Sequence, residues 1–125
     1  MGKMSRVFFL LAGFVLVLAT SCKSEFEKIR TSGDAEAMYK KAFEYYDKEE
    51  YQKAQTLLEL VISNYRGRKE SEEIYFRYAY TYYYLGQYLL ASYYFKNFSQ
   101  TYSTSSYREE ADFMDAYSNY QLSPT

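Results

Sequence analysis

Residues 71–102, SEEIYFRYAYTYYYLGQYLLASYYFKNFSQTY, decide the fold, because the sequence on either side repeats their pattern at a fixed offset. Tyr80 lies 37 residues after Phe43 and 37 residues before Tyr117, and other aromatic and alanine positions align in the same register. A period between about 20 and 50 residues is typical of proteins that stack repeated units. The sequence therefore predicts a stacked repeat domain.

Each copy of the repeat predicts two helices. In the central copy Tyr75, Tyr78 and Tyr82 recur at spacings of three and four, so they share one helical face, which we expect to meet the second helix. A turn at residues 85–87 precedes that second helix, over residues 88–98. The pattern resembles the tetratricopeptide repeat, a helical hairpin. The predicted fold class is all-α, an α-solenoid with two full hairpins plus the first helix of a third.

Short polar residues mark the predicted helix starts. Asp34 is expected to cap the first helix, because its side chain can accept hydrogen bonds from the unpaired amides of the first turn. Ser71 is expected to cap the third helix in the same way. Ser106 and Glu109 match a capping box at the start of the fifth.

The two full copies differ at one turn, where Glu49 stands in the place of Gly86. The predicted links between hairpins are residues 66–70 and 103–107. A fifth helix, from about residue 107 to 121, has no partner helix and leaves one apolar face exposed. Stacked repeats usually finish with a polar capping element, so we expect the natural protein to continue beyond this N-terminal part.

The chain begins with the features of a secretory signal peptide. Lys3 and Arg6 precede an uncharged run at residues 7–19, which is shorter than a membrane span of about 18 residues or more. Small residues follow, as at a cleavage site. We therefore assign residues 1–21 to a signal peptide.

The single cysteine closes this segment. Residues 18–22, LATSC, resemble a bacterial lipobox, in which Cys22 is acylated and becomes the first residue of the mature chain. A lone cysteine in an exported protein has no intrachain disulfide partner. We predict a lipidated cysteine and polar tether at residues 22–33 and a repeat domain at residues 34–125, anchored to a membrane surface by acyl chains.

Composition argues against catalysis and nucleic-acid binding. The sequence has no histidine, the commonest general base and a common metal ligand, and no glycine-rich phosphate loop. Loss of residues 1–21 removes two of 15 basic residues and none of 16 acidic ones, which leaves a formal charge of −3. A nucleic-acid surface requires clustered Lys and Arg. We predict no enzyme activity, no metal and no cofactor other than the acyl chains on Cys22.

The 18 tyrosines and nine phenylalanines include a second aromatic stripe along the first helices. Two interpretations remain open for it, a peptide-binding groove or packing between neighbouring hairpins. Tyrosine favours places where one end of the ring is apolar and the other wet. Lys40 and Arg77, beside the stripe, are candidate contacts for a peptide carboxylate. The stripe comprises Tyr39, Phe43, Tyr46, Phe76, Tyr80, Tyr83, Phe113, Tyr117 and Tyr120.

Several features together resemble one family of bacterial lipoproteins. They are the lipobox, the short tether, the links NYRGR at residues 64–68 and QTYSTS at 100–105, and the closing YQLSP at 120–124. These features are similar to the BamD family, the lipoprotein subunit of the outer-membrane β-barrel assembly machinery. The chain corresponds to about the first half of a member of that family.

This resemblance implies a non-enzymatic adaptor that is anchored in the outer membrane and faces the periplasm. The partners it implies are the barrel-forming assembly subunit, the other assembly lipoproteins and the C-terminal aromatic signals of unfolded outer-membrane proteins. Two alternatives remain open: an envelope adaptor for cell-wall or division factors, and a glycan-binding lipoprotein of an uptake system.

Overall fold

The computed structural model describes residues 23–124, which divide into two compact units after Ser32. In the first unit the described residues form one short helix, α2 (Glu25–Arg30). The hydroxyl of Ser24 caps it by accepting from the amide of Glu27, and Arg30 forms an ion pair of 2.8 Å with Glu27. The predicted polar tether thus contains a helix. The predicted signal peptide and Cys22 lie outside the described residues.

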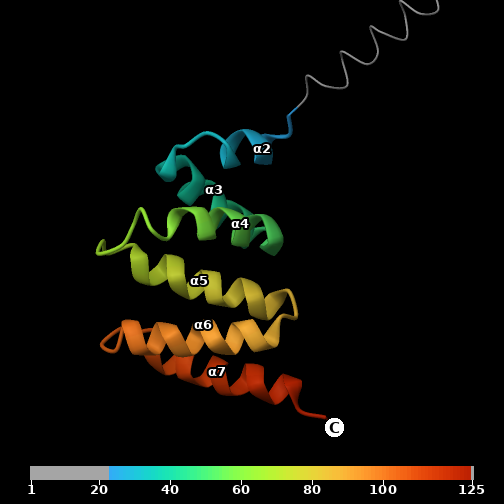
Figure 1. The fold of residues 1–125 in the computed structure, drawn as a ribbon, viewed down its shortest axis with the longest axis vertical. Coiled ribbons are helices and arrows are strands. Elements are labelled where there is room, and N and C mark those ends of the chain that lie inside the picture. The colour runs from blue at the N-terminus through green and yellow to red at the C-terminus, as the bar shows by residue number, and fades with distance from the viewer. Residues whose placement is uncertain (1–22, 125) are drawn as a thin grey trace, which may run out of the picture. The chain divides into compact units, whose positions relative to one another are not determined.

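The second unit, residues 33–124, is a stack of helices in which each one packs against the next along the chain (Figure 1). Two hairpins and a fifth helix follow one another, and the described residues contain no strand, so the all-α fold is confirmed. The helices are α3 (Ala35–Asp47), α4 (Tyr51–Val61), α5 (Ser71–Tyr84), α6 (Tyr88–Thr101) and α7 (Arg108–Leu122).

The helix ends agree only in part with the predicted caps. Asp34 does cap α3, since its carboxylate accepts from the amide of Ala37 at 3.0 Å. The prediction for Ser71 is wrong, because Ser71 is the first residue of α5 and not its cap. Its buried hydroxyl forms a hydrogen bond of 2.5 Å with the hydroxyl of Tyr102. The capping box at Ser106 is also wrong, because α7 starts two residues later and has no side-chain cap.

The links between hairpins also differ from the prediction. Helix α4 ends at Val61, so the first link covers residues 62–70 and begins four residues earlier than predicted. The second covers residues 102–107, close to the predicted range. Within the second link the hydroxyl of Ser105 accepts from the amide of Tyr107 at 3.1 Å, which orders the backbone just before α7.

The core of the unit lies between the hairpin helices. Ala79 of α5 and Ala91, Phe95 and Phe98 of α6 are fully buried. The small alanines let the helix backbones approach, and the phenylalanine rings fill the space between them. The stripe of Tyr75, Tyr78 and Tyr82 contacts Tyr94 of α6, as the sequence predicts.

A polar cluster joins α6 to α7. The hydroxyl of Ser92 donates to the carboxylate of Asp115, and the side-chain amide of Asn119 donates to Ser92 at 2.8 Å. Asp115 and Asn119 occupy the repeat positions of Tyr78 and Tyr82. Helix α7 therefore carries polar groups where α5 carries its hairpin-facing tyrosines.

Candidate functional site

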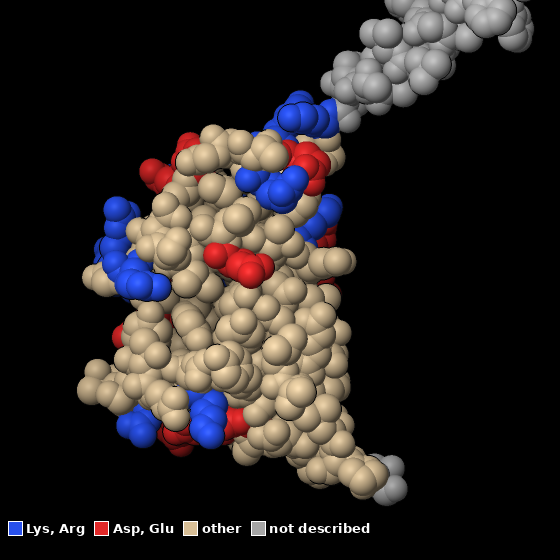
Figure 2. Space-filling view, viewed as in Figure 1, with Lys and Arg blue, Asp and Glu red and all other residues tan. Residues whose placement is uncertain are grey.

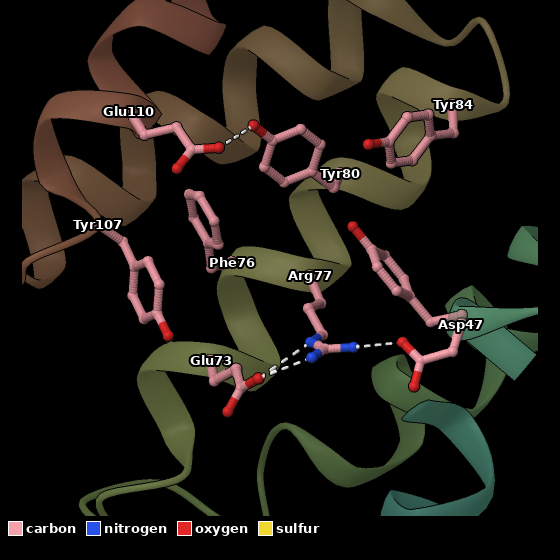
Figure 3. Close-up of a pocket in the computed structure, with 9 residues that line it drawn as sticks. Asp47, Glu73, Phe76, Arg77, Tyr80, Tyr84, Tyr107 and Glu110 are labelled. Atoms are coloured by element: carbon pink, nitrogen blue, oxygen red, sulfur yellow. Dashed lines mark hydrogen bonds and ion pairs between the residues drawn. The ribbon is translucent and has the colours of Figure 1, made fainter. Parts of the chain in front are cut away.

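A hollow of about 340 Å³ opens on the side of the stack formed by the first helices of the units (Figure 3). Helix α5 forms its floor, α3 one wall, and the start of α7 the other. Three of the nine aromatic residues predicted for a groove line it. The lining residues are Tyr46, Asp47, Glu73, Phe76, Arg77, Tyr80, Tyr84, Tyr107 and Glu110.

Paired aromatic rings form the apolar part of the hollow. Phe76 and Tyr107 stack with ring centroids 4.6 Å apart and planes at 19°, and they face each other in Figure 3. Tyr80 and Tyr84 stack at 5.5 Å and 24°. Phe76 is also part of the core, whereas Tyr84 is 48% exposed. The buried ring of Phe76 holds the ring stacked on it in place, and the exposed ring of Tyr84 is accessible to a ligand.

Arg77 lies between α3 and α5 and is already paired. Its guanidinium donates to Glu73 at 2.9 and 3.1 Å and to Asp47 at 3.1 Å, as the dashed lines in Figure 3 mark. It also lies 4.2 Å from the centroid of the Phe43 ring, a cation–π distance. Arg77 therefore joins the two helices.

Glu110, on the α7 wall, accepts a hydrogen bond from a tyrosine of the floor. The hydroxyl of Tyr80 donates to the Glu110 carboxylate across the hollow. Burial, together with this carboxylate, raises the pKa of Tyr80. Burial also raises the pKa of Tyr46, with a contribution from neighbouring Tyr84. A phenol is already neutral at physiological pH, and these shifts keep both hydroxyls protonated to higher pH.

The residues that line the hollow carry a net negative charge. Asp47, Glu73 and Glu110 contribute three negative charges, and Arg77 contributes one positive charge, so the lining carries a formal charge of −2. Carboxylates near the rim interact with a cationic group more strongly than in bulk water, because the aromatic walls exclude part of the solvent. The site favours positive over negative ligand groups.

The rings of the predicted aromatic stripe do not form one continuous surface. Tyr46, Phe76 and Tyr80 line the hollow. Tyr39 and Phe43 contact each other at 4.6 Å, beside Arg77 and Tyr65. In the first two units these rings therefore pack between helices and leave only part of their surface accessible.

The stripe of the third unit is open to solvent. Tyr117 stacks against Phe113 at 5.6 Å and 11°, and against Tyr120 at 6.1 Å and 15°. Phe113 is 62% exposed and Tyr120 68% exposed. Tyr83 of α5 packs against Tyr117 at 5.9 Å. These rings lie outside the hollow.

Lys40 belongs to a second hollow, of about 330 Å³, near the start of α3. Its ammonium forms an ion pair of 2.8 Å with Glu36 and is well exposed. Arg68, in the link before α5, lies 5.2 Å from the ring of Tyr65 in the same hollow. Here two cations and two carboxylates, those of Glu36 and Glu70, balance each other.

A separate apolar surface lies on α6. Leu89, Leu90 and Tyr93 are exposed there, and the corresponding positions of α4 are Gln52, Lys53 and Thr56. Figure 2 shows a broad area without charged side chains over α5, α6 and α7. The repeat architecture does not require this surface, because the first hairpin does without it.

Sequence reasoning missed five residues of the first hollow. Asp47 and Tyr84 lie at the ends of α3 and α5, and Tyr107 lies in a link. The sequence did mark Glu73 and Glu110 as a repeated position, since they lie 37 residues from each other and Glu73 lies 37 residues after Glu36. Acidic residues at helix starts are common, so the sequence alone favoured a solvated role for them.

No model of a known protein family matches the chain, and no curated protein matches it. Within residues 23–124, none of the helices is both long and apolar enough to cross a membrane. The same stretch has no group of three or more acidic or cysteine side chains placed to hold a metal ion.

Proposed function

We propose that this chain is a non-enzymatic, lipid-anchored adaptor of the outer membrane that faces the periplasm and binds unfolded segments of β-barrel proteins. In this proposal it works within the barrel assembly complex, beside the barrel-forming subunit. The observation that carries the proposal is the ring-lined hollow among α3, α5 and α7.

The hollow suits a peptide side chain better than a whole small molecule. Its volume is at the lower end of the range of about 300–1,000 Å³ that small-molecule sites occupy. It opens to solvent along the stack, so the backbone of a longer ligand can continue beyond it. An anchoring residue that enters a pocket while its chain continues outside is a common mode of peptide recognition.

The type of side chain follows from the walls. Tyr84 and Tyr107 present ring surface that is held by Tyr80 and Phe76. Aromatic pairs gain about 0.5–1.5 kcal/mol beyond simple burial, and rigid rings lose little entropy on binding. An aromatic residue of an unfolded barrel segment is therefore the anchor that these walls favour.

The cellular place in this proposal rests on sequence features alone. The positively charged start, the apolar run and the lipobox at Cys22 support export and lipidation. The similarity to BamD lipoproteins supports the outer membrane and the assembly complex. Cys22 lies outside the described residues, so these steps depend on no structural observation.

Binding of peptides tests the proposal. The full chain, kept in a mild non-ionic detergent, is titrated into a labelled peptide from the C-terminus of a barrel protein that ends in phenylalanine. We expect a Kd on the order of micromolar to millimolar, because a flexible peptide loses entropy when it binds. The same peptide ending in alanine is expected to bind at least about fivefold more weakly, as loss of one aromatic anchor implies.

A matched pair of variants locates the binding. Tyr84→Ala removes an exposed ring from the hollow, and Tyr93→Ala removes a similarly exposed ring, at 57%, from α6. The proposal requires that Tyr84→Ala binds the phenylalanine peptide more weakly than the parent protein and that Tyr93→Ala binds it with unchanged affinity. Equal affinity for the phenylalanine and alanine peptides, with helicity intact, would contradict it and favour an adaptor for cell-wall or division factors. Retention on polysaccharide would instead favour the glycan-binding alternative.

A further inference from the structure

The three repeats provide an internal comparison for the charges of the hollow. Glu36, Glu73 and Glu110 occupy the same position of successive units, at the start of α3, α5 and α7. In the first two units a cation follows four residues later and pairs with the glutamate: Lys40 with Glu36 at 2.8 Å, and Arg77 with Glu73 at 2.9 Å. This arrangement is the usual i, i+4 ion pair of a helix surface.

The third unit keeps the glutamate and lacks the cation. Met114 occupies the position of Arg77, and it packs in the core at 6% exposure. Glu110 accepts a hydrogen bond from the hydroxyl of Tyr80 and projects toward the hollow in Figure 3. A neutral hydroxyl satisfies one oxygen of the carboxylate and does not neutralise its charge.

Arg77, the one basic residue in the lining of the hollow, is already paired with other carboxylates. Arg77 bonds both Glu73 and Asp47 and lies over the ring of Phe43, so one guanidinium is shared between two carboxylates. Together with Glu110 the lining has an excess of two negative charges. The aromatic walls add negative ring faces, which also attract cations.

We propose that the hollow binds a lysine or arginine side chain that is adjacent to the aromatic anchor of the peptide. This inference rests on the proposed peptide-binding function and specifies its ligand. The ammonium or guanidinium lies between Glu110 and Asp47 and over the exposed ring of Tyr84, while the aromatic anchor packs on the neighbouring rings. Net negative charge in the lining disfavours a carboxylate at this position, so the basic side chain occupies it and the free carboxylate of a C-terminal aromatic residue lies outside the hollow.

Three peptides of one sequence test the charge requirement. They carry phenylalanine followed by lysine, by its neutral analogue norleucine, or by glutamate. The full chain in non-ionic detergent is expected to bind the lysine peptide roughly fivefold to tenfold more tightly than the norleucine peptide, and the glutamate peptide weakest. The difference is expected to shrink as salt rises, since part of the site is exposed.

A pair of adjacent variants assigns the effect to the hollow. Glu110→Gln keeps an acceptor for the hydroxyl of Tyr80 and removes the charge, whereas Glu109→Gln removes a charge from an exposed neighbour that does not line the hollow. We expect Glu110→Gln to lose the preference for the lysine peptide over the norleucine peptide, and Glu109→Gln to keep it. Circular dichroism of both variants confirms that the helices are intact.

The outcomes separate this inference from the proposed function. If replacement of phenylalanine abolishes binding while lysine and norleucine bind equally, the aromatic groove stands and the basic subsite is overturned. If lysine is preferred and Glu109→Gln has the same effect as Glu110→Gln, the attraction is a general effect of net charge and the assignment to the hollow is overturned. If neither residue of the peptide matters, both proposals fail.

Discussion

Glu49 and Gly86 occupy the same left-handed backbone position in two successive hairpin turns, with φ of 62° and 74°. In both turns the residue donates its amide to the carbonyl three positions earlier at 3.0 Å, so the turns are alike. A side chain is strained in this region by about 1 kcal/mol, because Cβ approaches the neighbouring carbonyl oxygen. The first hairpin therefore contains a strained turn that the second avoids.

Glu49→Gly is expected to stabilise the protein. The gain should be about 0.5–1 kcal/mol in the free energy of unfolding, since relief of the strained φ exceeds the extra entropy of glycine in the unfolded chain. The measurement is urea unfolding followed by circular dichroism. Glu49→Ala serves as a control, because it removes the carboxylate and keeps the strain. A gain as large in Glu49→Ala as in Glu49→Gly would contradict the backbone explanation.

Gly86→Ala is expected to have the opposite effect. Nothing lies within 4 Å of a Cβ built at Gly86, so the substitution adds no collision and tests the backbone alone. We expect a loss of about 1 kcal/mol in the free energy of unfolding. Unchanged stability in the same urea titration would show that this turn accommodates a side chain without strain.

Ser71 and Tyr102 form a hydrogen bond between the start of α5 and the end of α6. Tyr102→Phe is expected to cost about 1 kcal/mol, because the buried hydroxyl of Ser71 loses its partner. The measurement is a double-mutant cycle with Ser71→Ala in urea unfolding. The double variant should cost less than the sum of the two single variants. Strict additivity would show that the bond contributes nothing.

Phe76 and Phe113 share one repeat position and differ in environment. Phe76 is 7% exposed in the core, whereas Phe113 is 62% exposed on α7. Phe76→Ala is expected to cost about 3–5 kcal/mol, through lost burial and a cavity. Phe113→Ala should stay within about 0.5 kcal/mol of the parent protein. Similar thermal midpoints for the two variants would contradict the different packing of α5 and α7.

The repeat register predicts the fold well, because stacking imposes the same burial on each hairpin. Ala42 and Ala79 are fully buried at equivalent positions. The register fails in the third unit, where Ala116 is exposed. Among the described residues no helix follows α7 to complete a third hairpin, so Ala116 meets solvent where the equivalent Ala79 is buried against α6.

The candidate site could be predicted only in part. Periodicity placed Tyr46, Phe76 and Tyr80 on one side of the stack, and these three line the hollow. Asp47 and Glu110 come from α3 and α7, and only the stacking around α5 brings them to one place. Helical periodicity describes one helix at a time, so it gives no information on which helix ends meet.

High pH is expected to destabilise the protein through its buried tyrosines. Burial raises the pKa of Tyr75 to about 12, and burial with neighbouring Tyr82 and Tyr94 raises the pKa of Tyr78. In the unfolded chain these phenols ionise near pH 10. Between about pH 10 and 12 the unfolded chain thus loses protons that the folded protein keeps.

The contribution of these tyrosines to the free energy of unfolding is therefore expected to be constant below about pH 10 and to fall above it. The slope per tyrosine stays below about 1.4 kcal/mol per pH unit, because solvent screens the half-buried phenol of Tyr75. Urea unfolding at about pH 8, 9, 10 and 11 measures the slope. Tyr75→Phe should reduce the slope, because it removes one of these phenols. A flat profile up to about pH 11 would mean that these phenols ionise equally in both states, and that their burial imposes no cost on the charged form.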